Sequence, residues 1–232
     1  TRRSSDLFNR FCLSTGLAIL GLMATSLTAL GATTNGTVTF QDDTSATAPV
    51  DPTSPNVPLT TTDPNNPATN NTGTLTLDVA PKTIDFGTVT TSNAAKTYTA
   101  IGNYNQYLQV SDKRTTANGW QVNVKQDRTL TNASNNHMLT GAVIHLPQGT
   151  ARNSLNEPAS VADSNLVVAP SVSVTTADQV VFSAPNRAGV GKATSTNTWN
   201  AGAVTLSIPK LTAQVGNYTN NLVWTLVAAT TN

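Results

Sequence analysis

The sequence predicts an all-β protein, an antiparallel β-sandwich of Ig-like or jelly-roll-like type. From Gly73 onward, apolar and polar residues alternate at period two, in segments rich in Val, Thr, Leu and Ile. Asn, Gly, Pro and Asp separate these segments, and no helical period of useful length appears. Strands with one apolar face suit antiparallel sheets with one solvated side, and many short strands suit two packed sheets.

The first 32 residues have the layout of a signal peptide. Arg2, Arg3 and Arg10 precede an apolar stretch over 13–30, which ends in small residues. An N-terminal membrane anchor is the alternative, although several Ser, Thr and Gly residues dilute the stretch. The single cysteine, Cys12, lies in this segment, so we expect an exported chain without thiols, disulfides or cysteine-ligated zinc.

The pattern of residues 33–72 predicts a short strand followed by a spacer. Gly36 to Gln41 (GTVTFQ) has a strand pattern. Residues 42–72 are rich in Pro, Thr, Asn, Asp and Ser and contain almost no large apolar residue, which favours an extended, disordered linker. The predicted folded domain therefore covers 73–232.

Five strands of that domain stand out in order. Their apolar faces are Leu75, Leu77 and Val79; Leu108 and Val110; Trp120, Val122 and Val124; Val204, Leu206 and Ile208; and Leu222, Trp224 and Leu226. Asn118-Gly119 is a turn signal before the third of them. The stretch from Gln148 to Pro170 is less patterned, and we expect a long loop there.

Charge argues against nucleic acid as a partner. The chain has 13 basic and 12 acidic residues. Removing the signal peptide takes away three basic residues and one acidic residue, which leaves ten basic and eleven acidic residues. No basic patch remains to neutralise phosphates, and charge-driven binding to a membrane surface is equally unsupported.

The sequence gives no sign of an active site. The only glutamate is Glu157, with Asp163 nearby in an unpatterned stretch, which is a weak pair for glycoside hydrolysis. His137 and His145 are too far apart for a close-spaced zinc motif, and no G-x-S-x-G occurs. We expect no enzyme, no catalytic residue, no metal and no cofactor.

Two tryptophan motifs lie on predicted strands and carry a family resemblance. Trp120-Gln121-Val122 follows the Asn-Gly turn, and YTNNLVWTL spans Tyr218 to Leu226. The chain resembles the WxL family of Gram-positive surface proteins, in which a proximal Trp-x-aliphatic motif precedes a distal Trp-x-Leu in a Tyr-x-x-x-aliphatic-x-Trp-x-aliphatic frame. Similar segments in the same order are GTVTF, DPNNP, GTLTLD, IDFG, VSDKR, GW and LTGA.

The resemblance implies non-covalent attachment to the Gram-positive cell wall, with peptidoglycan as the ligand. It also implies surface complexes with a membrane-anchored WxL-interacting protein. The alternative function is an adhesin or complex subunit that binds such a protein or a host ligand without binding the wall. A third hypothesis is a wall hydrolase that depends on Glu157.

Each candidate site residue has a structural and a functional interpretation. Trp120 and Trp224 lie on apolar strand faces with Val122, Leu222 and Leu226, so we expect them in the core, and the motif then marks the fold more than the contact surface. Trp199, between loop-like residues, is either an exposed platform for a sugar ring or a plug at the end of the sandwich.

The remaining candidates are polar. Asp112, Lys113 and Arg114 form the densest charge cluster of the domain, which is either a hydrogen-bonding site for an amide-rich glycopeptide or a solvated turn. Tyr218 either ties a strand corner through its hydroxyl or contacts a partner, and we favour the structural role.

Overall fold

The computed structural model describes residues 31–116 and 119–229. The chain divides into two units, Thr1–Phe40 and Gln41–Asn232. The expected signal peptide lies almost wholly outside the described residues, as does Asn118 of the predicted turn. Residues 31–40 are exposed and contain no helix or strand, so the strand expected at Gly36 to Gln41 is absent. A strand needs a hydrogen-bonded neighbour, and none pairs with this segment.

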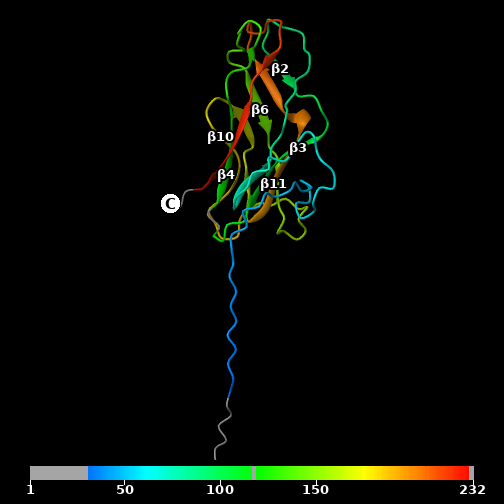
Figure 1. Ribbon diagram of the computed structural model, residues 1–232. Helices are drawn as coiled ribbons and strands as arrows, with labels where there is room; N and C mark the ends of the chain where they lie inside the picture. Colours follow the sequence, from blue (N-terminus) through cyan, green and yellow to red (C-terminus); the bar gives the residue numbers. More distant parts are fainter. Residues whose placement is uncertain (1–30, 117–118, 230–232) are drawn as a thin grey trace, which may run out of the picture. The chain divides into compact units, whose positions relative to one another are not determined.

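The unit Gln41–Asn232 consists of antiparallel strands, as the alternation predicts (Figure 1). The first sheet has the order β1 (Leu75–Val79), β3 (Asn105–Asp112), β11 (Ala193–Asn200), β7 (Thr150–Asn153). The second has the order β14 (Leu222–Ala228), β4 (Trp120–Gln126), β10 (Gln179–Ala184), β8 (Val167–Val168). The third has the order β2 (Lys96–Thr99), β12 (Thr205–Ile208), β6 (Val143–Pro147), β9 (Ser171–Val174). β5 (Thr131–Asn132) pairs with β13 (Tyr218–Thr219), and one 3-10 turn, η1, spans Ala201–Ala203.

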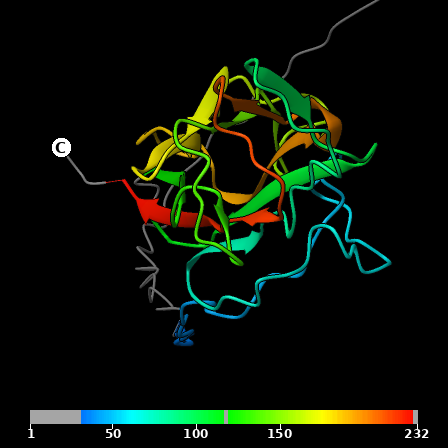
Figure 2. The same ribbon diagram turned by 90° about the horizontal axis from the view of Figure 1, so that it is seen from above.

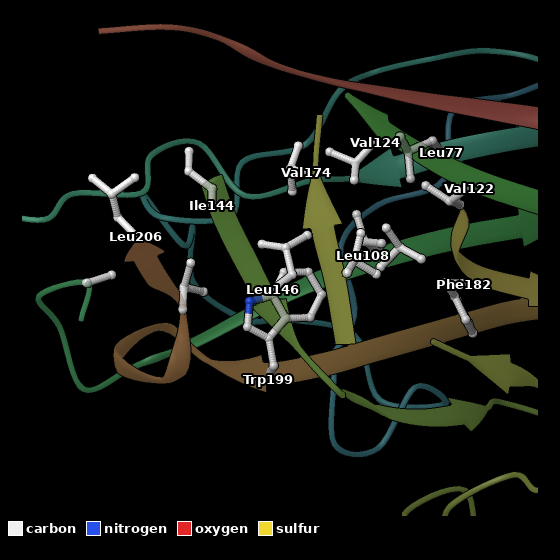
Figure 3. Close-up of a cluster of buried hydrophobic side chains, with 14 of the residues drawn as sticks. Leu77, Leu108, Val122, Val124, Ile144, Leu146, Val174, Phe182, Trp199 and Leu206 are labelled. Atoms are coloured by element: carbon white, nitrogen blue, oxygen red, sulfur yellow. The ribbon is translucent and has the colours of Figure 1, made fainter. Parts of the chain in front are cut away.

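One hydrophobic core joins the three large sheets. Leu77 and Leu108 of the first sheet meet Val122, Val124 and Phe182 of the second, so these two sheets pack in a sandwich-like way (Figure 3). The third sheet extends the same core with Ile144, Leu146, Val174 and Leu206. The alternating apolar positions of the sequence thus fill one interior.

Residues 43–72 form part of the folded unit, and the expectation of a disordered linker is wrong for them. We call this segment the strap. Gln109 of β3 accepts a hydrogen bond from the Val50 amide at 2.9 Å and donates to the Ala48 carbonyl at 3.0 Å. The hydroxyls of Thr196 and Thr198 on β11 donate to the Pro52 carbonyl. The folded unit therefore begins near residue 41 and not at 73.

The strap covers the outer face of the first sheet, which is polar. The buried side chains on this face of the sheet are Thr76, Asp78, Tyr107, Gln109, Ser111, Thr196 and Thr198. The carboxylate of Asp78 accepts hydrogen bonds from the Ser111 hydroxyl at 2.6 Å and from Gln109. Because both faces of this sheet are covered, its central strand β11 (ATSTNTWN) is buried although it is polar. Alternation could not predict that strand.

The stretch from Gln148 to Pro170 is only partly a loop, because it contains β7 and β8. β7 is held at the edge of the first sheet by pairing with β11. Across the described ranges, no helix has the length and apolar character needed to cross a membrane.

A groove between the two tryptophan-bearing layers

The structure has a groove between two edge strands, β1 of the first sheet and β14 of the second. Figure 2 shows the two strands as neighbours, with β14 in red. We call it the β1–β14 groove. Its volume is about 560 Å³. It is lined by Asn70, Asn71, Thr72, Leu75, Thr76, Leu77, Trp224, Thr225 and Leu226. None of these side chains is charged, and the lining contains the complete distal Trp-x-Leu motif.

Trp224 and Leu226 line the groove because β14 is an edge strand. Along β14, Leu222, Trp224 and Leu226 are half-buried, whereas Val223, Thr225 and Val227 are exposed. The inward residues pack against the core, but β14 has a neighbour on one side only, β4. The prediction of a core position for Trp224 is thus only partly correct, since its ring remains accessible from the groove.

The strap supplies the other wall of the groove. Thr69 donates its hydroxyl to the Leu77 carbonyl at 2.6 Å, and the Asn71 amide donates to the same carbonyl at 2.9 Å. Asn70 adopts a left-handed backbone with φ of 59°, which Asn tolerates better than most residues. Sequence reasoning missed this wall, because Asn70 to Thr72 read as spacer and carry no motif.

Trp120, the first residue of the proximal motif, is a core residue as predicted. Its exposed fraction is 0%, and its indole nitrogen donates to the Gly191 carbonyl at 3.1 Å. Its ring meets Phe182 edge-on, with centroids 4.9 Å apart. Gly191 has a φ of 70°, and an added Cβ there would lie 2.8 Å from the indole nitrogen. Val122 is equally buried, so the proximal motif does not reach the groove.

Trp199 is buried, so of its two interpretations the exposed platform is wrong and a ring packed inside the sandwich is the one that agrees with the structure. Its exposed fraction is 4%, and its indole nitrogen donates to the Gln106 side-chain carbonyl at 3.1 Å. Figure 3 shows its ring beside Leu146 in the core. The ring also stands 6.3 Å from that of Trp224, centroid to centroid. Trp199 thus lies behind Trp224, on the core side of the groove.

The Asp112, Lys113 and Arg114 cluster is occupied by contacts within the chain. The Arg114 guanidinium donates two hydrogen bonds to the buried Asp112 carboxylate, at 2.9 and 2.8 Å, and one to the Gly119 carbonyl. Lys113 reaches Ser45 and the Asp43 carboxylate of the strap. The cluster is therefore neither a free ligand site nor a simple solvated turn: it fixes the β3–β4 connection and one end of the strap.

Tyr218 and Leu222 have structural contacts. The Tyr218 hydroxyl lies 2.9 Å from Nδ1 of His137, and the two rings meet edge-on. This contact ties β13 to the segment that follows β5. Leu222 pairs with Gln126 at the start of β14 and packs against the core.

The groove offers one accessible aromatic ring beside amide and hydroxyl groups, without charge. That combination suits a neutral, hydroxyl- and amide-rich ligand, because a charged ligand would lose hydration without gaining an ionic partner. Among the described residues, no group of three or more His, Cys, Asp or Glu side chains is placed to hold a metal ion.

These features define an all-β domain whose groove is built on a Trp-x-Leu strand. The family described as WxL domain surface cell wall-binding matches residues 28–229, which is most of the chain. The chain belongs to the WxL family, and at the level of the family it is a cell-surface protein with a cell wall-binding domain. No curated protein and no solved structure matches it.

Proposed function

We propose that this chain is a non-enzymatic binding module, exported by its signal peptide, that attaches non-covalently to the peptidoglycan of a Gram-positive wall through the β1–β14 groove. The observation that carries the proposal is Trp224: the distal motif places its accessible ring in a groove with no charged lining. The wall as the partner comes from the family.

The neutral repeating sugars of peptidoglycan fit this chemistry. An indole ring offers a flat apolar surface to the C–H face of a sugar, while Asn70, Asn71 and Thr76 offer amide and hydroxyl groups to its polar substituents. Because no charge lines the groove, binding should depend little on ionic strength.

The test is co-sedimentation of the fragment 33–232, which contains the whole compact unit, with isolated Gram-positive wall sacculi. We expect saturable pelleting that persists at high salt. Trp224→Ala should weaken it about tenfold or more, which corresponds to about 1.4 kcal/mol. Val223→Ala is the matched control, because Val223 lies on the opposite, exposed face of the same strand. Equal pelleting of both variants would reject the groove as the wall site.

A second function has its own supporting observation. The outer face of the second sheet exposes Val167, Val180, Val223 and Val227, each at 38% or more. Exposed apolar positions gathered on one sheet face suit a protein partner, as in an adhesin or a subunit bound to a membrane-anchored WxL-interacting protein. A folded fragment that stays in the supernatant with sacculi but is retained by such a partner would favour this function.

A further inference from the structure

The edge of β14 is long and uncovered, unlike the other edges of the three large sheets. The other edges of the three large sheets are short or covered in the described part of the chain. β8 has two residues, and β2 and β9 have four each. At the edge of β7, the Ala151 carbonyl accepts from the Asp163 amide at 2.8 Å. At the edge of β1, the Asp78 carbonyl accepts from the Thr69 amide at 2.8 Å.

β14 has none of these protections. It is seven residues long, LVWTLVA, with no charge and no proline. Its pairing with β4 runs from Leu222 to Ala228 without a register shift, so no bulge twists the edge away. Natural edge strands of this length usually carry such a device, because an open edge is a template for another strand.

The phase of the β4–β14 ladder shows which backbone groups are free. The Asp127 amide donates to the Asn221 carbonyl, and the Ala229 amide donates to the Gly119 carbonyl, so the odd-numbered residues of β14 bond to β4. The amides and carbonyls of the even-numbered residues therefore point to the open edge. These residues are Leu222, Trp224, Leu226 and Ala228. No hydrogen bond described for this chain uses them.

The sequence of β14 is complementary to itself about Thr225. In an antiparallel pair of two copies centred there, Trp224 pairs with Leu226 of the other copy, and Leu222 pairs with Ala228. On the outer face, Val223 lies opposite Val227. All of these pairs are uncharged, and apolar or β-branched cross-strand neighbours stabilise a sheet.

We propose that two copies of this chain associate by pairing β14 with β14 in antiparallel register about Thr225, which joins the two second sheets into one continuous sheet. Each copy offers four free residues, so about eight backbone hydrogen bonds form. The contact is one strand long, roughly 24 Å, and therefore belongs to the small, weak class of interfaces. The second copy covers the mouth of the β1–β14 groove, so it excludes a ligand there.

The register provides a specific test. Thr225 faces Thr225 of the other copy as a non-hydrogen-bonded pair, in which the two Cα atoms are about 4.5 Å apart. Thr225→Lys places two positive charges side by side, and Thr225→Glu places two negative ones. We expect either variant alone to raise the dimer dissociation constant about tenfold or more, and an equimolar mixture to form a Lys–Glu heterodimer. Val167→Lys adds the same charge to the far strand β8 and should leave the dimer intact.

The measurement is sedimentation equilibrium of the fragment 33–232 at up to several hundred micromolar, without wall material. Far-UV circular dichroism is recorded for each variant, so that unfolding is not mistaken for dissociation. Because no wall is present, the outcome is separate from the wall-binding test. A dimer that tolerates Thr225→Lys, or folded charge variants that fail to associate when mixed, would overturn the proposed register. A wild-type chain that stays monomeric, whether or not it accepts a foreign strand at β14, would overturn the second copy as the occupant.

Discussion

At the scale of single residues, the two tryptophan motifs share a pattern but differ in environment. Trp120 lies on β4, which has neighbours on both sides, and its ring is fully buried with its indole nitrogen bonded. Trp224 lies on the edge strand β14, and its ring is half-buried. The position of a strand in its sheet therefore decides whether a Trp-x-aliphatic motif is a core element or part of a surface.

This difference predicts unequal costs of truncation. Trp120→Ala should lower the free energy of unfolding by about 3–5 kcal/mol, because it leaves a cavity in a packed core. Trp224→Ala should cost about half as much or less, because water already reaches part of the ring. Urea unfolding followed by circular dichroism measures both. Equal losses would contradict the two environments.

At the scale of elements, the strap extends the folded unit and covers the outer face of the first sheet. It binds the first sheet mainly through polar contacts, and it buries Asp78, Tyr107 and Gln109. Burial raises the pKa of the Tyr107 hydroxyl, and the Asp63 and Asp51 carboxylates of the strap raise it further. The strap therefore acts as a covering layer, although its composition resembles that of a linker.

Removing the strap should destabilise the domain. A fragment 73–232 loses all contacts of the strap. Three of them, from Val50 to Gln109 and from Thr196 and Thr198 to Pro52, contribute about 3 kcal/mol at about 1 kcal/mol per bond, so we expect a loss of at least this size. The melting temperature should fall by at least roughly 6 °C. The fragment 41–232 is the control and should melt like 33–232. If 73–232 melts at the same temperature, the strap is not part of the stable fold.

At the scale of the whole molecule, two kinds of carboxyl group act in opposite directions on stability. Burial raises the pKa of Asp78, although Ser111, Thr76 and Gln109 lower it in part. In contrast, the pKa of Asp127 is lowered, first by the hydrogen bond from the Asn221 amide. The dependence of stability on pH is the sum of such groups.

The sign of each contribution follows from its shift. Asp78 favours folding fully below its ordinary pKa of 3.8, and this contribution disappears as the pH rises through its raised pKa. Asp78→Asn should therefore flatten the fall in stability above about pH 4. Asp127 contributes above its ordinary pKa, and the contribution is lost as the pH falls through the lowered value, so Asp127→Asn should act only at acid pH. Urea midpoints measured across this range test both, and an unchanged profile in Asp78→Asn would contradict the burial of a charged form.

The sequence by itself determined the all-β antiparallel class, the faces of β1, β3, β4, β12 and β14, and the family. Period-two alternation and local motifs lie within single segments of the chain, so they can be identified without knowing which segments become neighbours. It did not determine β11, the strap or the exposure of Trp199 and Trp224, since these depend on which strands lie at an edge and which faces are covered. The tertiary structure decided them: it placed the strap over a polar sheet face, buried Trp199 and left Trp224 on the one long open edge of the described sheets. The physical reason is that burial depends on neighbours far apart in the chain, and a polar strand between two covered faces has no local signal.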